Sequence, residues 1–131
     1  MVLPSNSNCK SINLIYAIHC LKCNKSYIGQ TGRSAEARIS EHINKIIKYK
    51  KNKNILENEN IDSLILYNHF KNDDHEIKEH FRFQVLCKDI LNYRIRLETD
   101  LMYIFNTIFP NGLNNLTLDF NNNFETYNFN Y

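Results

Sequence analysis

Two cysteines and two histidines of this chain have types and a spacing that could bind a metal ion. Cys20 and Cys23 form a Cys-x-x-Cys pair, and His69 and His75 follow as His-x5-His. Thiolates and imidazoles are typical zinc ligands, whereas a redox Cys-x-x-Cys pair is expected to open a helix after a strand. The Cys-x2-Cys-x45-His-x5-His spacing is looser than that of a zinc finger. From the spacing alone, a zinc site and separate core cysteines with loop histidines are equally good interpretations.

A second set of side chains could act on an anionic substrate. Tyr16 and Tyr27 each lie in a short apolar run, and Arg38 and His42 are four residues apart. A helix would place Arg38 and His42 on one face. A planar guanidinium fits phosphate oxygens, and a histidine titrates near neutral pH. Taken singly, each tyrosine is more often a packing residue, and Arg38 and His42 could form an exposed surface pair.

The elements that would position these side chains begin with a β-hairpin. Residues 12–19 and 26–30 are rich in β-branched and aromatic types, which predicts two strands joined by the loop LKCNK. Gly29 is weak inside a strand, so it predicts a bulge or a close backbone approach. Paired strands would bring Tyr16 and Tyr27 close together beside Arg38.

Two helices are expected next. Ser34 is a good N-cap for a first helix that ends near Lys48. Its apolar positions recur at helical spacing and are Ala35, Ile39, Ile43, Ile46 and Ile47. The polar residues 48–62 predict a solvated connection. Asp62 or Ser63 would then cap a short helix that runs to residue 70.

The rest of the chain predicts a loop, a strand and a last helix. Residues 71–79 are polar, and Phe81, Phe83 and Val85 alternate with polar residues as in a half-buried strand. Asp89 would cap a helix that Pro110 and Gly112 stop. The apolar stripe of that helix comprises Ile90, Leu97, Leu101, Ile104 and Ile108. The order predicts a single α/β domain over residues 12–118: a small three-stranded antiparallel sheet flanked by helices.

An ordered set of short motifs resembles the GIY-YIG nuclease family. The set comprises LIY at 14–16, YIG at 27–29, Arg38-x3-His42, Glu98 within a helix and Asn114 after Gly112. The resemblance covers roughly residues 12–118. Leu14 stands where the family usually has glycine, but the tyrosine that carries the chemistry is present.

The resemblance implies a metal-dependent DNA endonuclease. Glu98 would bind Mg²⁺ (or Mn²⁺) through its carboxylate, although it could instead pair with Arg94. Arg38 would meet the scissile phosphate, and Asn114 would orient the site by hydrogen bonds. Tyr16 would be the general base, assisted by the second tyrosine and the histidine. The implied catalytic residues are therefore Tyr16, Tyr27, Arg38, His42, Glu98 and Asn114.

The cysteine and histidine pairs favour one group within this family. The string KSYIGQTGR, with a cysteine pair before it and a histidine pair downstream, is similar to the nuclease domain of Penelope-like retroelements. This implies one structural Zn²⁺, which would tie the hairpin loop to the segment after the second short helix. Its ligands would be Cys20, Cys23, His69 and His75. His80 is an alternative to His75, Cys9 could be a spare ligand, and Cys87 is expected to be a packing residue.

Charge is distributed unevenly between the two halves of the chain. Residues 1–53 carry ten Lys or Arg and two Asp or Glu, for a net charge of +8, and residues 54–131 carry −6. A basic half is expected for a polyanionic partner such as DNA, although a solvated lysine face explains it equally well. The residues expected to contact DNA are Arg33, Lys45, Lys48, Lys50, Lys51 and Lys53.

The setting of the protein is also an expectation from sequence. No run approaches the ~18 apolar residues of a membrane span, and the first residues lack the apolar core of a signal peptide. These features predict an intracellular, nuclear protein with residues 1–11 as an extension and 119–131 as a flexible Asn-rich tail. A reverse transcriptase domain or another partner would supply target choice. The alternatives are a GIY-YIG nuclease of repair or homing type, and a non-catalytic zinc module that binds nucleic acid.

Overall fold

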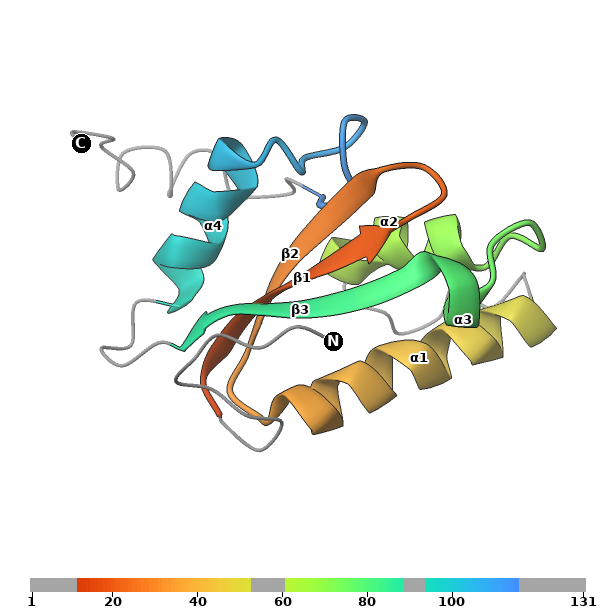
Figure 1. Cartoon of the computed structure of the whole chain (residues 1–131), viewed down its shortest axis with the longest axis horizontal. Coiled ribbons are helices and arrows are strands. Elements are labelled where there is room, and N and C mark those ends of the chain that lie inside the picture. Colours follow the sequence, from red (N-terminus) through yellow and green to blue (C-terminus); the bar gives the residue numbers. More distant parts are fainter. Residues whose placement is uncertain (1–11, 53–60, 89–93, 116–131) are drawn as a thin grey trace.

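The chain forms an α/β fold around one small antiparallel sheet (Figure 1). The computed structural model describes residues 12–52, 61–88 and 94–115. Within these ranges the strands are β1 (Leu14–Cys20), β2 (Lys25–Thr31) and β3 (Phe81–Lys88), in the order β2-β1-β3. The predicted fold class is confirmed. The first strand begins two residues later than expected from residues 12–19.

The hairpin of β1 and β2 brings the two tyrosines onto one face. Tyr16 lies opposite Gly29, and Tyr27 lies opposite Ile18. A Cβ atom on Gly29 would lie 2.4 Å from Cζ of Tyr16, so only glycine leaves room for that ring. Gly29 therefore marks the predicted close approach, although a side chain and not backbone makes it. The register shift of the sheet lies elsewhere, between β1 and β3.

Four helices lie in the described residues: α1 (Ala35–Lys51), α2 (Ile61–Phe70), α3 (Ile77–His80) and α4 (Arg94–Ile104). The predicted cap of α1 is confirmed, because the Ser34 side chain accepts from the amide of Ala37. The predicted end of α1 is wrong by three residues. The predicted caps of α2 are also wrong, since Asp62 and Ser63 lie inside the helix.

Two further boundaries differ from the sequence prediction. The expected loop 71–79 contains most of α3, a single turn. The last helix ends at Ile104, so Ile108 lies beyond it, while Asp89 and Ile90 lie outside the described residues. Asn106 adopts a left-handed conformation with φ of 55°, which ends the helix well before Pro110. Gly112 has another role, because the backbone of Thr107 occupies the space that a Cβ would need.

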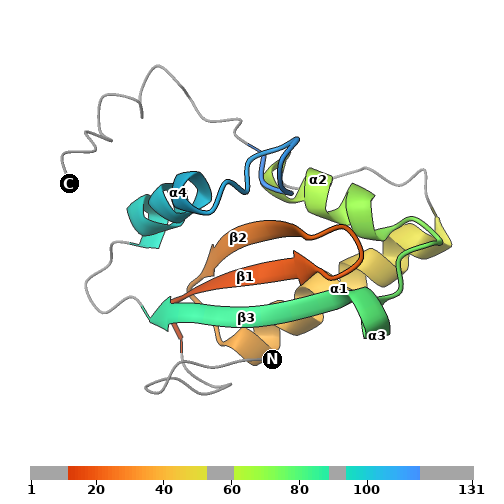
Figure 2. The same cartoon turned by 45° about the horizontal axis from the view of Figure 1, so that its top comes forward.

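The helices cover both faces of the sheet (Figure 2). Side chains of α1 and α2 pack on the face that carries Tyr16, and Met102 of α4 packs on the opposite face beside Ile15. The predicted apolar stripe of α1 is right except at Ile47, which is 39% exposed. The helix instead buries His42 and Tyr49. Within the described ranges, no helix is long and apolar enough to cross a membrane.

Candidate active site and metal centre

The hydroxyl of Tyr16 is the centre of a buried polar cluster. Tyr16 lies on β1 with no exposed surface. Nε of Arg38 donates to the hydroxyl oxygen at 2.9 Å, and Nε2 of His42 lies 2.7 Å from it. Because a guanidinium can only donate, Nε2 of His42 is the acceptor that these two contacts offer to the Tyr16 proton. Arg38 and His42 of α1 therefore both form hydrogen bonds with Tyr16.

The hydrogen bonds continue from His42 to a residue that sequence reasoning missed. Nδ1 of His42 lies 2.9 Å from the hydroxyl of Tyr67 on α2. Since Nε2 accepts from Tyr16, Nδ1 carries the ring proton and donates to Tyr67. Tyr67 is only 2% exposed. In sequence it looked like one more apolar residue of a short helix, and nothing pointed to His42.

Burial fixes the protonation of this cluster. Burial, followed by the charges of Arg38 and Lys45, lowers the pKa of His42 to about 2. The expectation that His42 titrates near neutral pH is therefore wrong, and His42 is a neutral ring. Burial, then the neighbouring Tyr27, raises the pKa of Tyr16 well above its usual 10 despite the opposing effect of Arg38. Tyr16 is thus a phenol that donates to His42.

The cationic edge of the cluster is held by one carboxylate. Nη1 of Arg38 lies 2.6 Å from Oε1 of Glu41, and Arg33 forms an ion pair with the other oxygen of Glu41. The Arg38 side chain is 18% exposed, whereas that of Arg33 is 59% exposed. Arg38 therefore reaches from the buried tyrosine to the surface, where an anion could contact it.

Tyr27 and Asn114 complete this side of the sheet in different ways. The ring of Tyr27 lies 6.3 Å from the ring of Tyr16 and 6.0 Å from that of His42. Asn114 binds the edge of β2: its Oδ1 accepts from the Ile28 amide at 2.7 Å and its Nδ2 donates to the Ile28 carbonyl at 2.8 Å. Asn114 is 2% exposed, so it positions the strand beside Tyr27.

Glu98 approaches from α4, which packs against β2 and β1. Its carboxylate is close enough to be one of the charges that raise the pKa of Tyr16. Among the described residues, Glu98 belongs to no group of three or more His, Cys, Asp or Glu ligands.

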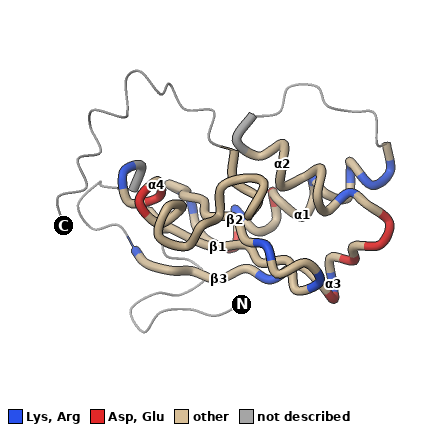
Figure 3. Tube along the Cα trace, turned by 90° about the horizontal axis from the view of Figure 1, so that it is seen from above, with Lys and Arg blue, Asp and Glu red and all other residues tan. Residues whose placement is uncertain are grey.

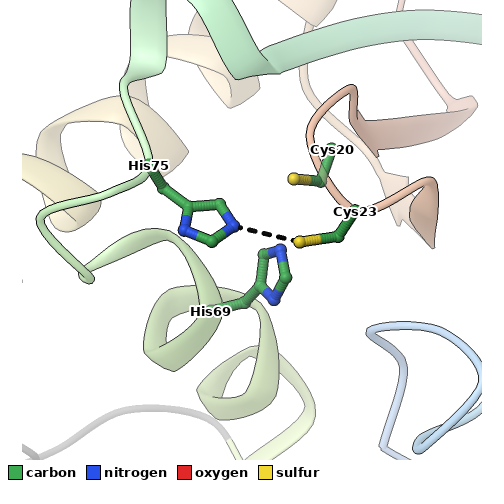
Figure 4. Close-up of side chains that lie close together, drawn as sticks. All are labelled: Cys20, Cys23, His69 and His75. Carbon is green, nitrogen blue, oxygen red and sulfur yellow. Dashed lines mark hydrogen bonds between the residues drawn. The ribbon is translucent and has the colours of Figure 1, made fainter.

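The four cysteine and histidine residues form a second cluster at the far end of β1 (Figure 4). Cys20 ends β1 and Cys23 lies in the hairpin turn; His69 lies in the last turn of α2 and His75 follows that helix. Their ligand atoms all lie within 4.8 Å of one another. This cluster could bind a metal such as zinc, and it brings the hairpin loop beside the end of α2 and the segment that follows.

The chemistry of these atoms fits a zinc ion. Tetrahedral zinc separates its sulfur and nitrogen ligands by about 3.3–3.8 Å, from bond lengths of about 2.0–2.3 Å. Sγ of Cys23 lies 3.3 Å from Nε2 of His75. Nε2 of His69 is buried without a hydrogen-bond partner among the described residues. Burial, then His75, lowers the pKa of His69 to about 4, which leaves the neutral ring that binds metals.

Neighbouring groups orient the metal-binding rings. Oδ1 of Asp74 accepts from Nδ1 of His75 at 2.8 Å, which directs the free lone pair of Nε2 toward Cys23. Lys50 donates to the carbonyl oxygens of Asn72 and His75, so α1 holds this segment in place. Burial raises the pKa of the Cys20 thiol, and a thiolate there requires a cation beside it.

The remaining candidate ligands fall outside this cluster. Nδ1 of His80 accepts from the amide of Glu76 at 2.8 Å, so His80 acts in α3 and His75 occupies the cluster. Cys87 packs in the core on the α4 side, as predicted. Cys9 lies outside the described residues.

Of the residues expected to contact DNA, Arg33 precedes α1, and Lys45, Lys48, Lys50 and Lys51 lie along it (Figure 3). Lys48 and Lys51 are exposed in its last turn, while Lys50 is engaged with backbone oxygens. Lys45 lies 6.0 Å from the centre of the Tyr67 ring. Lys53 lies outside the described residues. The basic end of α1 is about 20 Å from Arg38 at 1.5 Å per residue, so any single duplex would have to span both.

A scan against family models and searches of curated proteins and of solved structures with this chain find no match.

Proposed function

We propose that the chain is a metal-dependent DNA endonuclease domain of the GIY-YIG type, which hydrolyses phosphodiester bonds. The observation that carries the proposal is the convergence of Arg38 and His42 on the single hydroxyl of Tyr16, with Tyr27 alongside. These side chains come from two strands and a helix. Their order in the sequence is the order that the family resemblance requires.

Arg38 is proposed to bind the scissile phosphate. Burial works to lower its pKa, but the surrounding phenol groups of Tyr16 and Tyr27 outweigh it and raise the pKa, so the guanidinium stays charged. Its Nε and Nη1 atoms are held by Tyr16 and Glu41. This pre-organises the cation before substrate arrives, which is the arrangement expected for stabilising charge that develops on a phosphate.

Tyr16 is proposed to be the group that takes the proton from the attacking water. It can do so only after losing its own proton, and its burial opposes that loss. That proton would pass to Nε2 of His42, which would hold it as an imidazolium hydrogen-bonded to Tyr67 while Tyr16 acts as the base. A divalent cation bound at Glu98 would supply positive charge at the phosphate and the leaving oxygen. Tyr67 is then a positioning residue that fixes the tautomer of His42.

The metal cluster is proposed to hold one structural Zn²⁺. Four protein ligands leave no open position for water, which is the pattern of a structural site. Zinc would fasten the hairpin loop to α2 and so hold β1 and β2 in register. We further propose, from the resemblance to Penelope-like retroelements, that the domain nicks target DNA in the nucleus, with a reverse transcriptase domain or partner supplying target choice.

The complete burial of Tyr16 and His42 favours one other function, a non-catalytic zinc module that binds nucleic acid. In that case the hydrogen bonds at Tyr16 serve only folding. A repair or homing nuclease of the same family is the other alternative, and it leaves the four metal-binding residues without a stated role.

A plasmid-nicking assay separates the enzyme from the binding module. Glu98→Gln removes the charge proposed to bind Mg²⁺ and keeps the shape of the side chain. Glu79→Gln makes the same change at an exposed residue of α3. We expect Mg²⁺-dependent nicking by the wild type and Glu79→Gln, and a loss of at least about 100-fold in Glu98→Gln. Nicking by Glu98→Gln at the wild-type rate, or no nicking by any variant at any Mg²⁺ or Mn²⁺ concentration, would reject the proposal.

A further inference from the structure

A pocket opens on the sheet face opposite to Tyr16, beside the end of α4. Its volume is about 290 Å³, near the lower end of the roughly 300–1,000 Å³ typical of ligand pockets. All three strands and the segment after α4 line it. The apolar part of the lining comprises Ala17, Ile28, Leu86 and Phe105, and the polar part comprises His19, Ser26, Gln84 and Thr107. Ile28 and Thr107 form hydrogen bonds with Asn114 of the candidate active site, and the other lining residues belong to neither that site nor the metal cluster.

The polar lining is a row of side chains joined across the sheet. Nδ1 of His19 lies 2.7 Å from the Ser26 hydroxyl, and Nε2 of His19 lies 3.1 Å from Oε1 of Gln84. Because the Gln84 oxygen only accepts, Nε2 carries the ring proton and Nδ1 accepts from Ser26. The contact with His19 uses only the amide oxygen of Gln84, so its two N–H donors remain for a ligand. The Ser26 oxygen keeps a lone pair that can accept.

The rim of the pocket is aromatic. Phe105 lines the pocket and is 57% exposed, which leaves a ring face available to a flat ligand. His19 of β1 pairs with Ser26 of β2 on one side and with Arg82 of β3 on the other. Arg82 is exposed to solvent. Nη1 of Arg82 donates to the carbonyl oxygens of Phe81 and Lys78, and these two contacts orient the guanidinium. Neither contact is with a carboxylate, so neither neutralises its charge.

We propose that this pocket binds one unstacked nucleobase of a single-stranded nucleic acid. A base has a π-face for Phe105, and its edge carries carbonyl and ring-nitrogen acceptors for Gln84. Its phosphate would lie near Arg82. A size suited to one planar ring system and a nearby cation favour this occupant over a larger apolar ligand. DNA and RNA share this chemistry, so the experiment has an arm for each.

The proposal rests on the proposed nucleic-acid partner and does not depend on cleavage. Fluorescence anisotropy without added Mg²⁺ would compare ten-nucleotide strands of oligo(dU), oligo(U) and an abasic backbone of equal length. Phe105→Ala and Phe109→Ala are matched variants, since both rings are 57% exposed and only Phe105 lines the pocket. Both substitutions fall on exposed side chains, so the fold is expected to survive.

We expect Phe105→Ala to weaken binding of the preferred strand by about 5- to 100-fold, to the level of the abasic strand. Phe109→Ala should bind like the wild type. Tighter binding of oligo(dU) than of oligo(U) assigns the pocket to DNA, and the reverse assigns it to RNA. Equal binding of abasic and base-containing strands, or equal loss in the two variants, overturns the proposal.

A second measurement places the base directly. Titration of the full chain with thymidine, which has no phosphate for Arg38 to bind, followed by NMR, should move the His19 ring resonances and leave those of His42 unchanged, because His42 lies on the opposite sheet face. Shifts at His42 without shifts at His19 would overturn the pocket. Base-dependent binding by a chain that never nicks plasmid would keep the pocket and reject the nuclease.

Discussion

β1 and α2 each supply one side chain to both polar clusters of the molecule. Tyr16 and Tyr67 belong to the tyrosine–histidine cluster, and Cys20 and His69 belong to the cysteine–histidine cluster. In the first cluster, hydrogen bonds of 2.7–2.9 Å join Tyr16, His42 and Tyr67. In the second, the ligand atoms face one another, and Nε2 of His69 is buried without a hydrogen-bond partner in the described part of the chain.

The difference indicates what each cluster requires. Hydrogen bonds within the protein are enough to order the tyrosine–histidine cluster, so it should form without a ligand. A buried nitrogen without a partner is costly, and two thiols beside two imidazoles gain most from a cation. The cysteine–histidine cluster should therefore depend on metal. Substitutions in one cluster, with a measurement on the other, test whether the two clusters are independent.

The largest effect is expected at the metal cluster. Cys23→Ser should abolish stoichiometric zinc binding and lower the free energy of unfolding. The physical reason is linkage: a ligand present at 1,000 times its Kd stabilises the folded state by about 4 kcal/mol. Metal analysis and thermal melts measure the two losses. Cys87→Ser is the control, since Cys87 packs beside α4 and outside the cluster; equal zinc loss in both variants would contradict the account.

A smaller loss is expected when the tyrosine ring is displaced. In Gly29→Ala the new methyl group would lie 2.4 Å from Cζ of Tyr16, so the ring or the strand must move. Overpacking of this kind costs about 1–3 kcal/mol of unfolding free energy. Denaturant unfolding gives the cost, and zinc content should not change. An unaltered stability would show that the Tyr16 ring lies elsewhere.

The pH dependence of stability tests the buried histidine. The folded pKa of His42 is about 2 and its usual value is 6.5, so below pH 6.5 the unfolded state binds the proton and the folded state does not. Stability should be complete above pH 6.5 and fall toward lower pH, by up to about 1.4 kcal/mol per pH unit. His42→Gln should have a flatter slope between pH 4.5 and 6.5. Parallel slopes for the two proteins would contradict a buried neutral His42.

The smallest effect is expected at the basic end of α1. Each phosphate contact contributes about 0.9 to the slope of log K against log salt. Lys48→Glu and Lys51→Glu should each flatten that slope by about this amount, because both side chains are exposed. Lys50→Ala should mainly lower stability, since Lys50 holds the carbonyl oxygens of Asn72 and His75. If neither substitution changed the slope of log K against log salt, DNA would have to bind on another surface.

The sheet and the metal cluster could be predicted because each leaves a local signature. Alternating apolar residues indicate the strands, and Ser34 marks the start of α1. The cysteine pair falls in a hairpin turn, and the family resemblance, not the spacing, favoured a metal site. The spacing could not show that His75, and not His80, is the fourth ligand. That outcome depends on α3, where the ring of His80 accepts from the amide of Glu76.

The partners of His42 could not be predicted from the sequence. Tyr67 lies 25 residues away in the sequence, and neither its spacing nor its type shows that it packs against α1. The protonation of His42 was misjudged because the i, i+4 pattern gives a helix face and not the depth of burial. The end of α4 was missed since Asn106, an ordinary polar residue in sequence, adopts the left-handed conformation that stops the helix.

The central claim is that the tyrosine–histidine cluster cleaves DNA while the metal cluster only supports the fold. The most direct measurement is the plasmid-nicking rate of Arg38→Ala, with zinc content and melting temperature determined on the same preparation. Arg96→Ala, at an exposed position of α4, is the control. We predict that Arg38→Ala loses at least about 100-fold in rate, keeps one zinc per chain and melts within a few degrees of the wild type. Wild-type nicking by Arg38→Ala, or loss of nicking together with zinc, would contradict the account.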